Sequence, residues 1–320
     1  MEKKRKIIVC ISLAVLLIAG ICIGTMIGPK SIELPEVVDL STAVEPDDFY
    51  NEFQLYVNNS ELKNGNYIVS PLSFRQSMMT ITEKIEGNKQ KKLLNKMGFS
   101  TIEEYEKWNR ELLQFVKDFN NKEQNKQEDL SIDIGKAYIK DLWQKQFTYL
   151  PSYEDSFFTE AGKEIKKDYM KSATYYDYYK DKETELVSVP LTSNMSIAFV
   201  VGNIANIYDK IDNSIQQKVS LTIPKFSVSS QIDNDFFKNY LNNFDIETEN
   251  LKIEDIKQLL QVDINETGIG TKPATIIMGG NTTTSKEYIN FTIDKPYYFI
   301  VYNQDKSGEY NTFLFGCICE

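Results

Sequence analysis

A long connection with little to pack, placed between two strand-like segments, constrains this chain more than any other part of its sequence. The connection, Asn265–Asn290, reads NETGIGTKPATIIMGGNTTTSKEYIN and contains four glycines and a short polar run. The flanking segments, 259–264 and 291–302, are rich in the residues typical of strands. Connections of this length inside a compact domain are uncommon, and most are either functional or disordered. The sequence therefore predicts a β-rich domain with one long loop, either functional or a plain flexible surface segment.

Composition excludes several classes of function. The 320 residues are 42% hydrophobic and 12% aromatic, which is enough for a large core and too apolar for a globally disordered chain. The chain contains no histidine, which excludes Ser-His-Asp and Cys-His catalysis and histidine metal sites. The net charge is −10, and residues 29–320 alone carry 32 basic against 45 acidic side chains, so nucleic acid should be repelled. We therefore expect no nucleic-acid partner, no metal and no cofactor.

The four cysteines predict neither a disulfide framework nor a metal site. Cys10 and Cys22 lie in an N-terminal apolar run, whereas Cys317 and Cys319 are two positions apart and would share one face of a strand. Such neighbours seldom reach disulfide geometry, and a single C-x-C is a weak metal signal. We expect Cys317 and Cys319 to be buried thiols in a core strand.

The N-terminus predicts a membrane anchor. Residues 1–6 read MEKKRK, and residues 7–28 follow with no charge over 22 residues, long enough to cross a bilayer as a helix. The basic cluster predicts that residues 1–6 stay inside and that the rest of the chain lies outside. A cleaved signal peptide and a secreted protein are the alternative, but the apolar run is long and no A-x-A site follows it. Ile21 before Cys22 disfavours a lipoprotein site, and residues 29–47, with three prolines, are typical of a tether.

Periodicity predicts both helices and strands in the remaining chain. Apolar residues at helical spacing predict helices over 48–57, from Ser70–Pro71 onward, before Gly98, over 101–119 and over 233–244. Strand-like patterns cover 130–147, 166–170, 175–179, 186–190, 196–201 and 219–228. We expect a hairpin turn at 157–162. The tyrosines of 175–179 should cover a half-buried sheet face, with binding of a sugar or a partner as the alternative.

Five motifs, in the same order along the chain, resemble the serpin family. Residues 66–73, NYIVSPLS, are similar to the start of the serpin core, and 137–147 resembles the strand that enters the "breach" of the main sheet. The sequence IPKF at 223–226 is similar to the family's Leu-Pro-Lys-Phe strand. Asn265–Gly268 resembles the hinge of the reactive-centre loop, and 291–318 resembles the C-terminal strands.

This resemblance covers roughly residues 48–320 and implies an α+β serpin-like fold. Large antiparallel-rich β-sheets would pack with an N-terminal helical bundle, and a reactive-centre loop would be exposed at about 267–290. The chain is short for the family. Residues 120–136 pass almost directly to the segment of Trp143, so the helix, edge strands and crossing helix found there in serpins would be deleted. The main sheet would then be narrower and more exposed on one face.

The resemblance also implies roles for individual residues. The loop hinge would be made by Glu266, Gly268, Ile269, Gly270, Thr271, Pro273 and Ala274. Lys225 would oppose Glu266 at the breach, where Trp143 would also lie, and Ser70 and Ser73 would belong to the "shutter" beneath the sheet. Plain structural interpretations stay open. Trp143 would then be an ordinary core residue, and Ser70 and Ser73 would be a helix cap and its neighbour. Lys225 and Glu266 would form an exposed ion pair that contributes little to stability.

Inhibitory serpins are cleaved in the loop, form an acyl-enzyme, and insert the freed loop as a central strand that drags and distorts the protease. The scissile bond would lie among Thr282, Thr283, Thr284, Ser285 and Lys286. Family spacing from Glu266 reaches Thr282, whereas spacing back from Phe291 reaches Ser285. Either would favour an elastase-like or subtilisin-like protease, and Lys286 would favour a trypsin-like one.

Pro273 departs from the family pattern. Because proline has no N–H, it would cost about 2–3 kcal/mol in a central strand. If insertion were slower than deacylation of the acyl-enzyme, the protease would be released and the loop would act only as a substrate. Two functions follow: a monomeric, membrane-anchored inhibitor of a serine or cysteine endopeptidase, acting as a suicide substrate outside the membrane, or a non-inhibitory binding or structural module. We do not expect the chain to be an enzyme.

Overall fold

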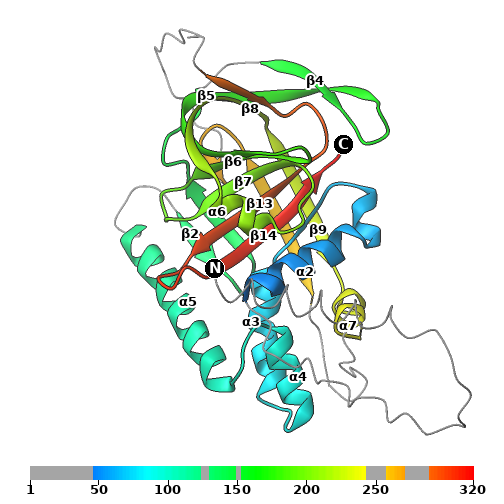
Figure 1. Cartoon of the computed structure of the whole chain (residues 1–320), viewed down its shortest axis with the longest axis vertical. Coiled ribbons are helices and arrows are strands. Elements are labelled where there is room, and N and C mark those ends of the chain that lie inside the picture. Colours follow the sequence, from blue (N-terminus) through cyan, green and yellow to red (C-terminus); the bar gives the residue numbers. More distant parts are fainter. Residues whose placement is uncertain (1–45, 124–129, 149–152, 243–256, 271–287) are drawn as a thin grey trace, which may run out of the picture. The chain divides into compact units, whose positions relative to one another are not determined.

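Two β-sheets and a set of mainly N-terminal helices make up the part of the chain that the structure describes (Figure 1). The structure is a computed structural model, and it describes residues 46–123, 130–148, 153–242, 257–270 and 288–320. The helices are α2 (Pro46–Asn58), a 3₁₀ turn η1 (Glu61–Asn64), α3 (Pro71–Thr82), α4 (Asn88–Lys96), α5 (Ile102–Glu123), α6 (Ile207–Asp212) and α7 (Asn234–Asn242). The α+β class expected from the sequence is confirmed.

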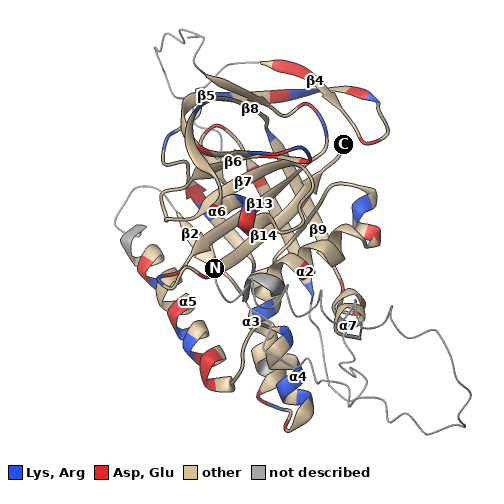
Figure 2. Cartoon of the chain, in the orientation of Figure 1, with Lys and Arg blue, Asp and Glu red and all other residues tan. Residues whose placement is uncertain are grey.

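Local signals start and stop these helices where the sequence predicts. Ser70 Oγ accepts a hydrogen bond from Ser73 N at 3.2 Å, and Pro71 stands in the first turn of α3. Gly98, with φ +80°, follows the end of α4. Helix α5 buries Trp108 on its inner face, while its exposed face carries interspersed acidic and basic residues (Figure 2).

A five-stranded sheet holds the segments that flank the long loop. Its order is β2 (Ser131–Asp133), β3 (Tyr138–Leu142), β11 (Gly268–Ile269), β10 (Gln258–Ile264) and β9 (Phe226–Ile232). Every neighbouring pair is antiparallel, so β3 and β10, on either side of β11, run parallel to each other. The segment that begins the long loop, β11, therefore lies in the interior of this sheet.

A second sheet has nine strands. Its order is β1 (Tyr67–Val69), β14 (Tyr310–Ile318), β13 (Tyr297–Gln304), β7 (Ser196–Gly202), β6 (Thr184–Pro190), β5 (Glu164–Lys180), β8 (Ile215–Pro224) and β12 (Ile289–Thr292), with β4 (Glu154–Phe158) paired to β5. Strand β14 is buried along its whole length. The loop returns through β12, which pairs in parallel with β8, so its two ends belong to different sheets.

Two segments predicted as single strands are instead broken. The segment 130–147 folds back as the β2–β3 hairpin, because Asp133 Oδ1 accepts a hydrogen bond from Lys136 N at 3.1 Å and Ala137 has φ +47°. The segment 219–228 divides at Lys225 into β8 and β9, which belong to different sheets. Pro224 ends β8, and Lys225 N donates to Asp168 O at 2.7 Å outside the five-stranded sheet.

Two other strand predictions were wrong in their extent. The segments 166–170 and 175–179 are parts of one strand, β5, whose 17 residues pair first with β4, then with β8 and, at the end, with β6. The run 291–302 divides into β12 and β13 around Pro296. The expected hairpin turn at 157–162 joins β4 to β5, with Gly162 at φ +75°.

The connection between the helices and the five-stranded sheet is short, as the sequence indicated. Helix α5 ends at Glu123 and β2 begins at Ser131, and no helix or strand among the described residues intervenes. One face of the sheet is correspondingly open: Leu259 is 72% exposed and Tyr138 is 41% exposed. The deletion inferred from the sequence thus leaves this face without a crossing helix in the described part of the chain.

Cys317 and Cys319 are buried and free, as expected. Burial raises the pKa of the Cys317 thiol above its usual range, which disfavours the reactive thiolate. None of the helices that the structure describes is both long enough and apolar enough to cross a membrane. The predicted anchor, residues 7–28, lies outside the described residues, as do the stub 1–6 and the tether as far as residue 45.

Candidate functional site

The predicted hinge contributes a short strand to the interior of the five-stranded sheet. Ile269 pairs with Asp141 of β3 on one side and with Ile264 of β10 on the other, and Gly268 pairs with Leu142. The side chain of Ile269 is fully buried. The first residues of the loop therefore already lie between β3 and β10.

Backbone hydrogen bonds hold this strand on both sides. Trp143 N donates to Thr267 O at 3.2 Å from the β3 side. On the β10 side, Gly270 N donates to Asp263 O at 2.8 Å. Because both neighbours contribute, the hinge is integrated into the sheet rather than resting on its surface.

Glycine is required at two hinge positions. A Cβ at Gly268 would lie 2.0 Å from the carbonyl oxygen of Asp141, a backbone atom that cannot move aside. Gly270 has φ +63°, and a Cβ there would lie 2.3 Å from the carbonyl oxygen of Ile139. Strand β11 ends at Ile269, the residue before Gly270. The other predicted hinge residues, Thr271, Pro273 and Ala274, lie outside the described residues, as do the scissile candidates Thr282, Thr283, Thr284, Ser285 and Lys286.

Lys225 and Glu266 lie opposite each other at the start of the hinge. Lys225 Nζ is 3.3 Å from Glu266 Oε2. The Glu266 side chain is 2% exposed and that of Lys225 is 25% exposed. Glu266 Oε1 accepts no hydrogen bond from any residue that the structure describes. The pair is therefore not the exposed ion pair that the sequence left open, since its carboxylate is buried.

This burial predicts an asymmetric response to mutation. Lys225→Met should destabilise the fold by about 2 kcal/mol, because it leaves a buried carboxylate without its cation. Glu266→Gln should cost less than about 1 kcal/mol, because the partly exposed ammonium of Lys225 can be hydrated. Urea unfolding of both variants at pH 7 measures the difference, and equal losses would contradict the burial argument.

Trp143 belongs to the core and also binds the hinge. Its side chain is 1% exposed and packs against Phe147, with ring centroids 5.2 Å apart. Its indole Nε1 donates to Asn265 O at 2.8 Å. The side chain of Asn265 in turn accepts a hydrogen bond from Thr267 N at 2.9 Å, which forms a tight turn before the strand. The sequence analysis named Asn265 only as part of the hinge motif and gave it no role of its own, although an Asn before a turn is a recognisable signal.

Asp141 is a buried carboxylate that sequence analysis missed. It is 0% exposed and accepts hydrogen bonds from Thr192 Oγ1 at 2.5 Å, from Leu142 N at 2.8 Å, and from both the hydroxyl and the N–H of Ser193. Burial raises the pKa of this carboxyl, and these hydrogen bonds oppose the rise. Asp141, the residue of β3 that pairs with Ile269, thus ties the β6–β7 turn to β3. Its position between Ile139 and Trp143, in phase with buried residues, was the available signal.

Ser70 forms a second anchoring point, beneath β10. Its Oγ donates to Phe313 O at 2.7 Å, and Ser73 is joined to it through the helix cap. Ser70 N donates to Gln258 Oε1 at 2.9 Å, and Gln258 Nε2 donates to Ser70 O at 2.8 Å. Gln258 therefore ties β10 to the start of α3. The sequence analysis missed Gln258, whose signal is a polar residue in phase with the buried Leu260 and Val262.

Comparison with known protein families gives this geometry its context. A family model described as "Serpin (serine protease inhibitor)" matches residues 134–315, more than half of the chain. The chain belongs to the serpin family. No curated protein matches it.

Solved serpin structures share the fold of this serpin at low sequence identity. Serpin48 of the insect Tenebrio molitor has a TM-score of 0.63 at 16% identity, covering 86% of this chain and 97% of that one. The thermophilic serpin tengpin has a TM-score of 0.64 at 15% identity, covering 89% and 95%. Thyroxine-binding globulin, solved with thyroxine, has a TM-score of 0.61 at 15% identity, covering 88% and 98%. Serpins in general are protease inhibitors rather than enzymes.

Proposed function

We propose that this serpin inhibits a serine endopeptidase, or a cysteine endopeptidase, as a suicide substrate of its reactive-centre loop. The observation that carries the proposal is the place of β11, whose residues pair with both β3 and β10. Insertion of a cleaved loop would continue this strand between the same two partners. The unfavourable first step of strand formation is therefore already complete in the uncleaved chain.

Display on the outer side of a membrane is part of the proposal. It rests on the uncharged run 7–28 and the basic residues that precede it. The tether 29–47 would hold an acidic domain close to the membrane, with its loop available to proteases outside the cell. Release as a secreted protein after cleavage of the segment is the alternative.

Incubation of the full chain with a panel of serine and cysteine proteases tests the proposal. We expect one class to form a complex that survives SDS, with cleavage between residues 282 and 287 identified by sequencing the released C-terminal fragment. The cleaved chain should melt at a much higher temperature than the intact one, because the inserted loop completes the sheet. Rapid cleavage with neither a complex nor a rise in melting temperature would refute inhibition.

A non-inhibitory binding module is the second candidate. The specific observation in its favour is the short β3, which offers only Tyr138–Leu142 as a partner for an inserting strand. Pairing with so short a strand would release less free energy when the loop inserts. A captured protease would then be distorted with less force. Cleavage that leaves stability unchanged would support this candidate.

A further inference from the structure

The five-stranded sheet ends at β2, a strand of three residues. Strand β2 pairs with β3 on one side, and no strand of the described part of the chain pairs with its other side. The opposite edge strand, β9, contacts the nine-stranded sheet, because Ile68 N of β1 donates to Ser230 Oγ at 2.8 Å. An unpaired edge presents backbone N–H and C=O groups to which another chain can bind. The outer side of β2 is therefore the edge where this sheet could gain a strand from another molecule.

Only Ile132 directs its backbone toward this outer edge. Along an antiparallel strand, successive residues direct their N–H and C=O groups alternately toward the paired strand and away from it. Ile132 lies opposite Ile139 of β3, but its own N–H and C=O are bonded to helix α5 instead. Ser131 and Asp133 consequently face β3. Ile132 thus carries the one outward donor and the one outward acceptor of β2.

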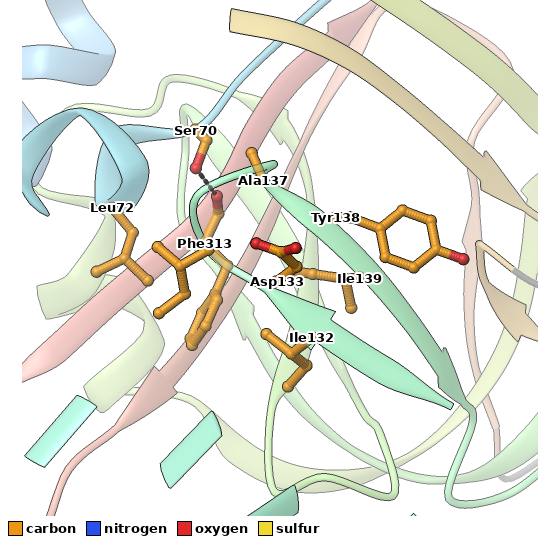
Figure 3. Close-up of a pocket in the computed structure, with 9 residues that line it drawn as sticks. Ser70, Leu72, Ile132, Asp133, Ala137, Tyr138, Ile139 and Phe313 are labelled. Atoms are coloured by element: carbon orange, nitrogen blue, oxygen red, sulfur yellow. Dashed lines mark hydrogen bonds between the residues drawn. The ribbon is translucent and has the colours of Figure 1, made fainter. Parts of the chain in front are cut away.

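The side chain of Ile132 fixes this orientation. It is 2% exposed, and it lines a small apolar pocket together with Leu72 and Phe313. Figure 3 shows these three side chains gathered around the pocket, whereas Tyr138 of β3 is directed away from it. Because the side chain of Ile132 is held in the core, β2 cannot rotate to hide its outward backbone groups.

Asn120, near the end of α5, binds both of these backbone groups. Its Nδ2 donates to Ile132 O at 2.9 Å, and its Oδ1 accepts a hydrogen bond from Ile132 N at 2.9 Å. A carboxamide offers the same donor and acceptor as a peptide group, so this one side chain takes the place of a neighbouring strand. Packing holds the helix at this position, since Phe119 is 6% exposed and the ring centroids of Phe115 and Phe313 are 6.1 Å apart.

We propose that the outer edge of β2 is a pairing surface for a second copy of this chain, and that Asn120 keeps this surface closed in the monomer. Without Asn120, the last turn of α5 is no longer bonded to the sheet and can fray away from the edge. Two copies of β2 can then pair antiparallel about Ile132, because the N–H of each Ile132 meets the C=O of the other. This contact uses the same residues on both copies, so it gives a closed dimer. The proposal is independent of protease inhibition.

Hydrogen exchange of the Ile132 amide in the full chain, kept in detergent solution, tests the proposal. Asn120→Ala removes both bonds to Ile132, and alanine, a better helix former than asparagine, preserves α5. In dilute protein we expect the Ile132 amide to exchange roughly tenfold faster than in the wild type, as for the loss of one hydrogen bond. In concentrated protein, pairing should restore its protection, and light scattering should show a larger dimer fraction than in the wild type.

Asn121→Ala is the matched control, because Asn121 is the next residue of the same helix and its side chain is exposed. It should match the wild type at every concentration. A further variant identifies the paired strand. In the antiparallel dimer, residue 131 of one copy lies opposite Asp133 of the other, so adding Ser131→Asp to Asn120→Ala opposes like charges. This double variant should lose the dimer and keep the fast exchange at every concentration.

The melting temperature of each variant shows whether it is folded. A folded Asn120→Ala whose Ile132 amide is as protected as in the wild type would overturn the proposal. Fast exchange without a dimer at any concentration would also overturn it, as would equal effects in Asn121→Ala. None of these outcomes depends on whether the chain inhibits a protease, which the SDS-stable complex measures separately.

Discussion

Replacing Gly268 with alanine is expected to drive the hinge out of the five-stranded sheet and to destabilise the folded chain by about 3 kcal/mol. The added Cβ would lie 2.0 Å from Asp141 O and 2.8 Å from Leu142 Cα. Both are backbone atoms of β3, so no side-chain rotation can relieve the overlap. Leaving the sheet exposes Ile269 and breaks the hydrogen bonds on both sides of β11, and these losses make up the expected destabilisation.

Hydrogen exchange and thermal unfolding measure the effect of Gly268→Ala. Amides of 141–143 and 263–270 should exchange faster, and the melting temperature should fall by roughly 6–12 °C. Gly135→Ala is the matched control, because its Cβ would meet only Asp133 Oδ1 at an ordinary 3.5 Å. Equal behaviour of the two variants would show that the hinge does not need glycine at this position. In a protease assay, Gly268→Ala should form less SDS-stable complex, because insertion would have to begin from a displaced hinge.

Replacing Gln258 with leucine is expected to cost about 3 kcal/mol and to loosen β10 from the helices. Gln258 is buried and exchanges two hydrogen bonds with the backbone of Ser70. Ser70 O keeps its helical partner, Phe74 N at 3.2 Å, but the Ser70 N–H would be left without its acceptor inside the core. A buried donor without a partner loses its full solvation, which is why leucine does not compensate.

The amide of Ser70 reports this change directly. Its hydrogen exchange should accelerate in Gln258→Leu, together with a lower urea midpoint. Gln261→Leu is the matched control, since Gln261 lies on the same strand with its side chain exposed. Loss of stability in the control as large as in Gln258→Leu would assign the effect to strand propensity rather than to the bond with Ser70.

Much of the architecture could be predicted because it depends on local physics. The helix start at Ser70–Pro71, the turn at Gly162 and the alternation along β10 are determined by residues a few positions apart. The hinge glycines could likewise be recognised in the sequence, because they depend on residue type and short spacing. The order of five short motifs, rather than any one of them, indicated the family that the family model then identified.

The errors share one cause, which is competition from distant partners. The segment 219–228 alternates without interruption in sequence, yet it divides at Lys225, where the backbone bonds to Asp168 instead of continuing in one sheet. The segments 166–170 and 175–179 form one strand because three different strands pair along its length. Periodicity predicts which face is buried, but it does not reveal which neighbour supplies the hydrogen bonds.

By itself, the sequence determined the family, the α+β class, the position of the loop, and the absence of histidine chemistry, because residue types and short-range spacing suffice for each. The folded structure was needed to show that the hinge already pairs inside the sheet and that the buried Glu266 lies beside the partly exposed Lys225. Only the structure identified Gln258, which is 188 positions from Ser70, and Asp141, which is 52 positions from Ser193. A polar residue in a strand pattern looks like an ordinary interruption until its partner is known. Such a residue is held in place by hydrogen bonds that form only when the chain has folded.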